Sequence, residues 1–464
     1  MNLLHKPHHK KSFFTQSVDM LHGPVVRSMI IFMIPMMLSA ILQSLFSAAD
    51  IAVVGNFASK ESVAAIGTTT SVINFLVGVS ISLSAGVNII LSRAIGMADE
   101  HRMRRTVGTA TVLSLSLGVL LAVVGILVTY PLLRLTSCPD NIIDQAALYM
   151  RLYLISMPAS LFYNFLSPVV TLNGDSTRPF IYLSVSGVAN VVLNLIFVVG
   201  FGMDVVGVAL ATVISLYLSA FLLLLRITRV EGACRLNLRN LNFSWYTFRK
   251  ILQYGIPSSI SGATSCISSM YIQTIVNAYQ DVGISGNTAA ASLEGFMFSI
   301  FGVLGGAIPA FMGQAIGADD RARVFKILKV GLLMTVSVGV LFGFIAAFLG
   351  EALLSIYLPG EEEAIAFGLI RLRHIMMLSV LCAVTYVQSA MMFAFGRTVL
   401  QMVNDLCFYC AFRVVWLAVI YKLHPCPEML YLTFPVSWLC VCLVMGVACF
   451  IVLRDYKRGA VAKL

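Results

Sequence analysis

The chain has 464 residues, of which 59% are hydrophobic and only 11% are charged, whereas a soluble globular protein carries roughly 25% charged residues. This composition excludes an ordinary soluble domain and predicts an integral membrane protein. The formal net charge of +10, from 31 Lys and Arg against 21 Asp and Glu, does not indicate a nucleic-acid partner, because the basic residues gather in short loops on one side of the expected membrane.

Apolar runs of about 20 residues or more follow one another along the chain, which predicts an all-α fold, because the strands of a membrane β-barrel are shorter and alternate in polarity. The linker 227–249 divides the expected spans into a first lobe of six over 25–226 and a second lobe of six over 250–454. Basic tails are expected at 1–24 and 455–464. The twelve expected spans cover roughly 25–54, 63–91, 106–130, 143–168, 180–201, 206–226, 252–279, 287–312, 327–350, 364–394, 399–421 and 430–453.

The distribution of Lys and Arg sets the expected orientation, since basic loops of a membrane protein stay in the cytoplasm. If the N-terminus is cytoplasmic, most basic residues fall in inner segments, as Arg102, Arg235, Arg239 and Arg323 do. The outer loops are nearly neutral or acidic, as at 361–363. We therefore predict a multi-pass protein of the cell membrane with both termini in the cytoplasm.

Three short motifs of the first half recur in the second half at almost constant spacing. They are Ile34-Pro35 with Ile256-Pro257, Ala94-Ile95-Gly96 before Asp99 with Ala315-Ile316-Gly317 before Asp319, and Gly174-Asp175-Ser176-Thr177 with Gly396-Arg397-Thr398. Because six spans bring the chain back to its starting side, the second lobe repeats the first with the same orientation. The two lobes are expected to be related by a pseudo-two-fold axis along the membrane normal, as in transporters that work by alternating access.

One acid stands out in the first span. Ser39, Gln43, Ser47 and Asp50 form a polar stripe on one face of an apolar helix, and Asp50 has no basic residue near it in that helix. An ionisable side chain within a membrane span usually faces a cavity and marks an ion or substrate path. We therefore predict a coupling role for Asp50, cavity-lining roles for Gln43 and Ser47, and a bend at Pro35.

Neutral polar side chains of later spans are the expected partners of Asp50. Asn190 and Asn194 lie one turn apart on the fifth span, and Thr212 lies on the sixth. One carboxylate with several neutral oxygens suits a proton or a small hard cation such as Na⁺. The alternative is that these side chains only hydrogen-bond between helices, as Asn and Thr often do in membranes.

The second lobe has no acid at the position that matches Asp50, which is Ile272. Glu294 is the isolated acid of the eighth span and is expected to face the cavity and attract cations, and Gln273 is expected to line the same cavity. Arg371 lies near the outer end of the tenth span, where its side chain is expected to reach toward the membrane surface. Asp405 and Arg413 lie about 12 Å apart along one helix, so we expect each to find partners on neighbouring helices.

The sequence contains no phosphate-binding GxxxxGK[ST] motif, no nucleophile–base arrangement and no metal-ligand cluster. We therefore predict a protein that is not an enzyme and that uses no cofactor other than its coupling ion, H⁺ or Na⁺. Uphill transport then depends on an ion gradient.

Several segments together resemble the MATE (multidrug and toxic compound extrusion) transporters over nearly the whole chain. They are Ile34-Pro35, 47–55, 94–96, 172–179, 207–215, 255–257 and 313–318. The resemblance implies twelve helices in two lobes and export of organic cations and drugs in exchange for H⁺ or Na⁺. A functional monomer in contact with membrane lipids is expected.

The same resemblance places the family's first-helix acid on Asp50 and its first-lobe ion site on Asn190, Asn194 and Thr212. Many bacterial members carry Asp at the position of Asn194, so Asp50 is the only carboxylate among these four residues. This difference favours H⁺ over Na⁺. The alternative function within the wider superfamily is a flippase or exporter of a lipid-linked or polysaccharide precursor, for which deep Lys and Arg residues are expected.

Overall fold

The structure, a computed structural model, describes residues 18–57, 59–135, 138–230 and 232–459, and these residues form helices and connecting turns without a β-strand. Most of the predicted N-terminal tail lies outside the described residues. The helices in chain order are α1 (Val25–Phe57), α2 (Lys60–Gly96), α3 (Glu100–Leu127), α4 (Thr129–Leu135), α5 (Ile143–Leu154), α6 (Met157–Thr171), α7 (Thr177–Asn194), η2 (Leu195–Gly200), α8 (Asp204–Arg229), α9 (Trp245–Asn277), α10 (Gln280–Gly317), α11 (Arg321–Tyr357), α12 (Glu362–Met376), α13 (Ser379–Ala394), α14 (Thr398–Asp405), η3 (Leu406–Ala411), α15 (Phe412–Leu423) and α16 (Pro427–Lys457).

These helices confirm the predicted all-α membrane fold, with one helix or one interrupted helix for each of the twelve spans. In the part of the chain that the structure describes, nine helices are long and apolar enough to cross a membrane, and two bent pairs bring the number to 11. The pairs are α5 with α6, bent by 43°, and α12 with α13, bent by 46°. The remaining predicted span is α9, a helix of 33 residues.

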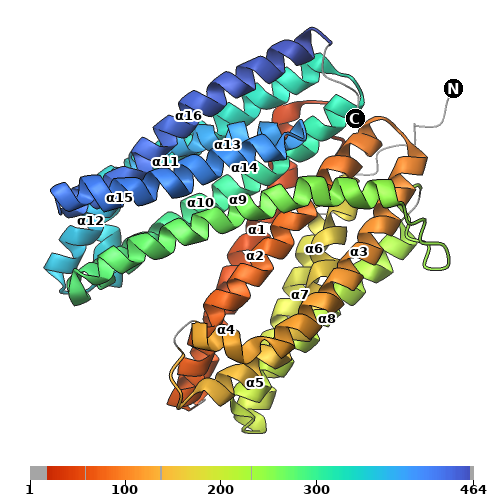
Figure 1. The fold of residues 1–464 in the computed structure, drawn as a ribbon. Coiled ribbons are helices and arrows are strands. Elements are labelled where there is room, and N and C mark those ends of the chain that lie inside the picture. The colour runs from red at the N-terminus through yellow and green to blue at the C-terminus, as the bar shows by residue number, and fades with distance from the viewer. Residues whose placement is uncertain (1–17, 58, 136–137, 231, 460–464) are drawn as a thin grey trace. The chain divides into compact units, whose positions relative to one another are not determined.

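Contacts divide the chain into two units, unit 1 with residues 1–73 and 99–245, and unit 2 with residues 74–98 and 246–464. In unit 1, α3 packs on α6, α7 on α8, and α1 on α7. In unit 2, α10 packs on α11, α12 and α13, and α16 packs on α12 and α13. Figure 1 shows these helices running side by side within each unit.

The second part of α2 packs with unit 2, whereas the sequence-based boundary placed it in the first lobe. Glycines permit this packing. A Cβ on Gly86 would collide with the carbonyl of Ile251 in α9, and one on Gly96 would collide with the carbonyl of Gln314 in α10. Small residues at crossings let the backbones of membrane helices approach closely.

The predicted internal repeat is visible in the backbone. Asp99 caps α3 by accepting a hydrogen bond from the N–H of Arg102 at 3.0 Å, and Asp320 caps α11 in the same way through Arg323 at 2.9 Å. Such side chains satisfy the free N–H groups of a helix start. The residues before these caps, Ala98 and Asp319, both have positive φ angles, 54° and 56°. The structural counterpart of Asp99 is therefore Asp320, one residue beyond the predicted Asp319.

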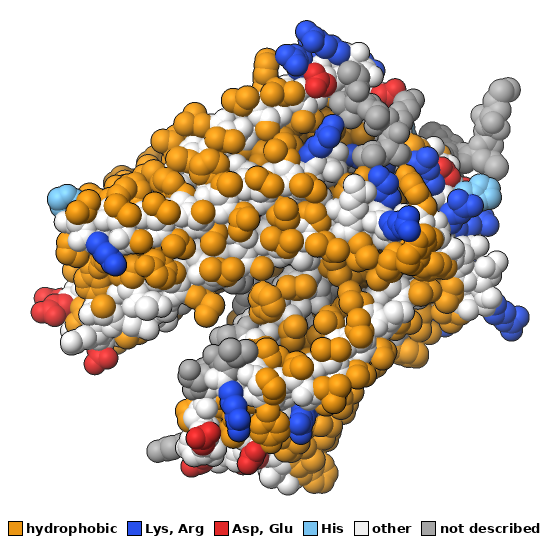
Figure 2. Space-filling view, in the orientation of Figure 1, with side chains coloured by type: hydrophobic (Ala, Val, Ile, Leu, Met, Phe, Trp, Pro, Cys, Tyr) orange, Lys and Arg blue, Asp and Glu red, His pale blue; other side chains and the backbone are white. Residues whose placement is uncertain are grey.

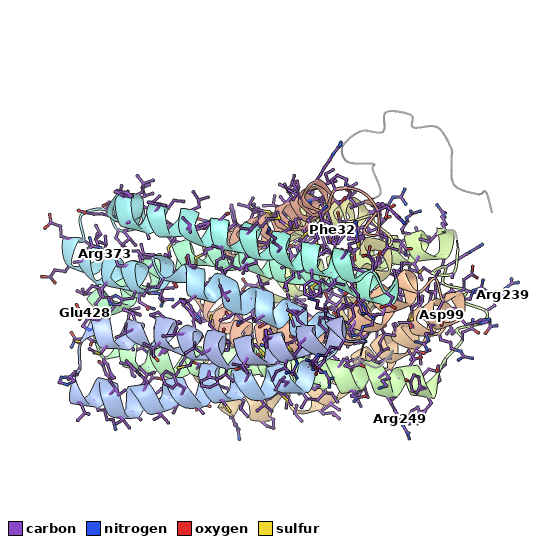
Figure 3. The ribbon with its side chains drawn as sticks, turned by 90° about the horizontal axis from the view of Figure 1, so that it is seen from above. Phe32, Asp99, Arg239, Arg249, Arg373 and Glu428 are labelled. Carbon is purple, nitrogen blue, oxygen red and sulfur yellow. The ribbon has the colours of Figure 1, made fainter. Side chains whose placement is uncertain are left out.

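The surface agrees with a membrane protein. Apolar side chains cover the long faces of the helices, while charged side chains gather at helix ends (Figure 2). In unit 2, Arg373 and Glu428 lie at one end of the helices and Arg249 lies at the other (Figure 3). Within unit 1, Asp99 and Arg239 lie together at one end of the helices of that unit (Figure 3).

Candidate functional site

The first candidate site is the carboxylate of Asp50, half-buried near the end of α1. The Asn194 amide nitrogen donates to Asp50 Oδ1 at 2.6 Å from the end of α7. The Asn190 amide, in the orientation that satisfies both groups, places its nitrogen 2.7 Å from Oδ1 and 3.2 Å from Oδ2. No basic side chain lies within 4.0 Å of this carboxylate in the described ranges. Two neutral amides therefore hold one carboxylate.

Thr212 completes the predicted group from α8. Its Oγ1 lies 3.4 Å from the amide of Asn190 and donates to the carbonyl of Val208 at 3.0 Å. Asn194 Oδ1 is buried and accepts no hydrogen bond from a described residue. A buried acceptor without a partner calls for a water molecule, an ion or a rearrangement. The structure thus brings together all four residues predicted for ion coupling.

A π-helical turn, η2, begins directly after Asn194. π-Helical turns insert one extra residue into an α-helix and occur frequently at functional sites. Asn190 and Asn194 are the last polar residues before this turn, and both are buried. The backbone irregularity and the candidate site therefore coincide.

The other residues of the predicted polar stripe on α1 contribute no described contact to the Asp50 carboxylate. Gln43 is exposed and is not among the described residues that bond to Asp50. The side chain of Ser47 lies outside the described residues. At the predicted bend, α1 continues as one helix through Pro35, and the Ser39 hydroxyl donates to the Pro35 carbonyl at 2.9 Å.

The prediction for Arg371 was wrong, and it changes the interpretation of Glu294. Arg371 does not extend toward the membrane surface but binds both carboxylate oxygens of Glu294, at 2.9 and 2.7 Å. The exposed fractions of the two side chains are only 12% and 1%. Glu294 is therefore neutralised by a buried guanidinium, and the expectation that it attracts cations loses its basis.

The same ion pair organises a polar network in unit 2. Arg371 Nη1 donates to Asn287 Oδ1 at 2.5 Å, and the Tyr431 hydroxyl donates to the same oxygen at 2.9 Å. The Asn287 amide nitrogen donates to Gln273 Oε1 at 3.3 Å. Gln273, predicted to line a cavity, thus joins α9 to this network.

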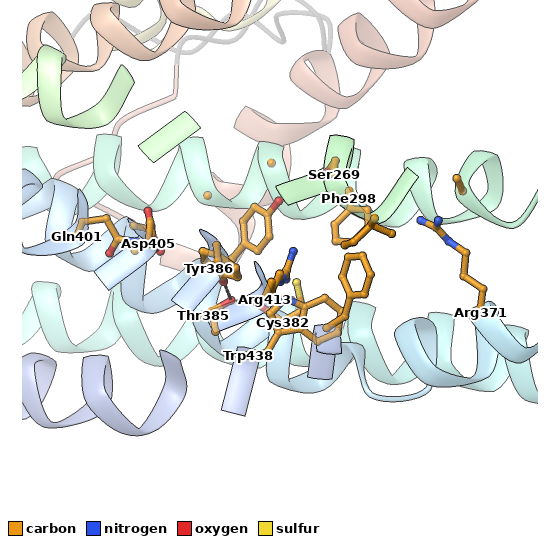
Figure 4. A pocket seen from close by; sticks show the side chains of 18 of the residues that line it. Ser269, Phe298, Arg371, Cys382, Thr385, Tyr386, Gln401, Asp405, Arg413 and Trp438 are labelled. Atoms are coloured by element: carbon orange, nitrogen blue, oxygen red, sulfur yellow. Dashed lines mark hydrogen bonds between the residues drawn. The ribbon is translucent and has the colours of Figure 1, made fainter. Parts of the chain in front are cut away.

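The second candidate site is a pocket of about 670 Å³ within unit 2. Gln273, Asn287 and Arg371 contribute to its wall, together with Asp405 and Arg413. In Figure 4, Asp405 and Gln401 lie toward one end, Arg371 lies toward the other, and Arg413 lies between them. Aromatic side chains supply much of the remaining lining: Phe298, Tyr386, Phe393, Tyr409, Phe434 and Trp438.

Asp405 and Arg413 each bond to another residue and not to each other, which confirms the prediction that they do not pair. Gln401, one turn before Asp405 on the same helix, donates to Asp405 Oδ1 at 2.8 Å, so this contact is local and does not join two helices. Arg413 donates from Nε to the Ser437 hydroxyl on α16 at 3.0 Å. The partner of Arg413 therefore lies on a neighbouring helix, as predicted.

The helical spans of the described residues, the internal repeat and the buried polar sites define a polytopic membrane protein with the architecture of a transporter. The MatE family model matches the chain twice, over residues 35–196 and 257–417. The two matches cover more than half of the chain and begin at the predicted repeat positions, Pro35 and Pro257. The chain therefore belongs to the MatE family.

Curated relatives of this chain are named as multidrug resistance or multidrug export proteins. Probable multidrug resistance protein YoeA of Bacillus subtilis is 28% identical over 345 residues, 73% of this chain and 74% of that protein. Multidrug export protein MepA of Staphylococcus saprophyticus is 22% identical over 315 residues, 68% of this chain and 69% of that protein.

Solved structures show the same fold. A structure titled "Crystal structure of MATE in the bent conformation" superposes with a TM-score of 0.88 at 19% identity, covering 97% of this chain and all of that one. A transporter from Pyrococcus furiosus, whose title reports reversed polarity of its binding pocket, superposes with a TM-score of 0.84 at 20% identity. Here the alignment covers 96% of this chain and 99% of that one.

Proposed function

We propose that this protein exports drug-like molecules across the cell membrane in exchange for protons, with Asp50 as the coupling group. The observation that carries the proposal is the carboxylate of Asp50, held by the amides of Asn194 and Asn190 without a basic partner among the described residues. The names of the curated relatives support multidrug export. The internal repeat supports alternating access.

The hydrogen bonds around Asp50 give a physical route for coupling. An ionised Asp50 accepts hydrogen bonds from both amides, and a protonated Asp50 loses negative charge and part of that accepting capacity. Protonation therefore weakens the contacts that hold α1 to α7. A substrate and a proton that favour different arrangements of these helices oppose each other's binding, and this coupling is reciprocal.

We favour H⁺ over Na⁺ as the coupling ion because Asp50 is the only carboxylate among the four residues of this site. A hard cation takes several oxygen ligands, among which carboxylates are common. A single carboxylate can take up one proton without further ligands. The membrane potential then adds about 2.3 kcal/mol per 100 mV for each charge that enters.

Purified protein in liposomes tests the function directly. We expect a fluorescent drug-like dye to accumulate against its gradient when a pH gradient is imposed, and not when a Na⁺ gradient of equal size is imposed. Dye movement is followed by fluorescence, and empty liposomes give the background. Accumulation driven by Na⁺ alone would assign the coupling to the other ion, and the absence of any gradient-driven movement would reject antiport.

We also propose that the linker between α8 and α9, within the predicted segment 227–249, lies in the cytoplasm and the start of α12 lies outside. In a background without native cysteines, a cysteine at Glu362 should react with an impermeant maleimide added to intact cells. A cysteine at Asn237, which is exposed in the linker, should react only after the membrane is opened. Labelling of position 237 in intact cells would reverse the proposed orientation.

A further inference from the structure

The pocket of unit 2 contains a buried cation that the proposed proton coupling does not use. We propose that Arg413 binds an anionic group of the substrate, so that this pocket accepts organic molecules in which a carboxylate is attached to an aromatic or apolar body. The inference rests on the proposed export function and extends it by naming a substrate class.

Arg413 is buried and has no counter-ion among the residues that the structure describes. Its exposed fraction is 6%, and its Nε donates to the neutral Ser437 hydroxyl. No carboxylate lies within 4.0 Å of its guanidinium in the described part of the chain. Arg413 nevertheless contributes to the pocket wall. A buried cation without a partner is costly, and a ligand that supplies the opposite charge recovers part of this cost.

Aromatic rings stabilise the guanidinium only in part. The guanidinium carbon lies 4.5 Å from the centre of the Phe434 ring and 5.0 Å from that of the Tyr409 ring. Such cation–π contacts orient the guanidinium and lower its cost, but they do not use its remaining N–H donors. A carboxylate matches the fork of these donors and can accept two of them at once.

Arg371 is not an equivalent site, although it lines the same pocket. Its Nε and Nη2 are already bonded to Glu294, and its Nη1 is bonded to Asn287. Among the described residues that line this pocket, Arg413 is therefore the cation that is available to a ligand. The anionic group of the substrate is therefore expected near the middle of the pocket, at Arg413, and not at the end where Arg371 lies.

The remaining lining describes the rest of the substrate. Phe298, Tyr386, Phe434 and Trp438 line the pocket with rings that suit a flat apolar body. Asp405 lies on the opposite side of Arg413 from Arg371 (Figure 4). An amino group of a zwitterionic substrate can therefore point toward Asp405 while its carboxylate binds Arg413.

The test uses two dyes that differ in one group. Rhodamine 19 has a free carboxylate, and rhodamine 6G is its ethyl ester. We expect purified wild-type protein in detergent to bind rhodamine 19 more tightly, as measured by fluorescence anisotropy without any gradient. Arg413→Gln should weaken rhodamine 19 binding roughly tenfold, since charge-assisted hydrogen bonds are the strong ones, and leave rhodamine 6G within about twofold. Arg413→Lys should retain part of the preference.

Two outcomes would overturn the proposal. In the first, Arg413→Gln weakens the binding of both dyes equally, which assigns Arg413 a purely structural role. In the second, Arg413→Gln does not weaken the binding of rhodamine 19. If the variant does not fold, 4-phenylbutyrate and its methyl ester are compared as competitors of rhodamine 19 on the wild type. Equal competition by acid and ester rejects the anionic site. Because these measurements need no gradient, they fail or succeed independently of proton coupling.

Discussion

Replacement of Asp50 by Asn is expected to give a protein that reaches the membrane but does not drive uphill export from a pH gradient. Asn is close to Asp in size and cannot ionise, so it resembles a permanently protonated carboxyl. The hydrogen-bond change that links proton binding to the contacts of Asn190 and Asn194 is then absent. We expect coupled transport in liposomes to fall to the background of empty liposomes, while downhill substrate exchange persists.

Two variants control this experiment. Asp140→Asn makes the same chemical change in an exposed loop and should transport like the wild type. Asp50→Glu keeps an ionisable group and should retain part of the coupling. Uphill transport by Asp50→Asn at a rate close to that of the wild type would show that Asp50 is not the coupling group.

The second large effect is expected at the buried ion pair. Removing one partner of such a pair leaves an uncompensated charge and typically costs about 3–5 kcal/mol. Glu294→Gln leaves the charge of Arg371 unbalanced, and Arg371→Gln leaves Glu294 buried at 1% exposure. Each single variant should therefore unfold at a clearly lower temperature than the wild type in detergent.

The double variant separates this effect from a loss of cation binding. Glu294→Gln combined with Arg371→Gln removes both charges and should recover much of the lost thermal stability. Glu351→Gln, on an exposed residue of α11, is the matched control and should change little. Single variants as stable as the wild type would show that the pair contributes nothing, and additive losses in the double variant would show that the two residues do not act together.

Much of the fold could be predicted because each membrane span is a continuous run of apolar residues, which can be recognised without knowing the rest of the structure. A bilayer requires about 20 apolar residues for each helix, and each predicted span corresponds to a helix or to a helix interrupted by a bend or a π-helical turn. The repeat was also readable, because Pro35 and Pro257 stand at matching positions. The grouping of Asp50 with Asn190, Asn194 and Thr212 came from the polar positions and from the family resemblance.

The second site could not be predicted in the same way, because its contacts join residues far apart in the chain. Glu294 and Arg371 are 77 residues apart, and nothing in either local sequence identifies the other as a partner. The environment of Arg413 depends on Ser437 and Phe434 from another helix. One signal was available, since a lone Arg within an apolar span needs a reason to be there.

The π-helical turn η3 lies between Asp405 and Arg413, so these two side chains need not turn together about the helix axis. A π-helical turn holds one residue more than the α-helical path it replaces. If the extra residue shifts along the helix during transport, every side chain that it passes rotates about the axis by roughly 100°, the share of one residue in an α-helical turn. A shift past Arg413 would turn its side chain out of the pocket while Asp405 stays in place, without any unfolding of the helix. The same reasoning applies to η2, where such a shift into α7 would turn Asn194 away from Asp50.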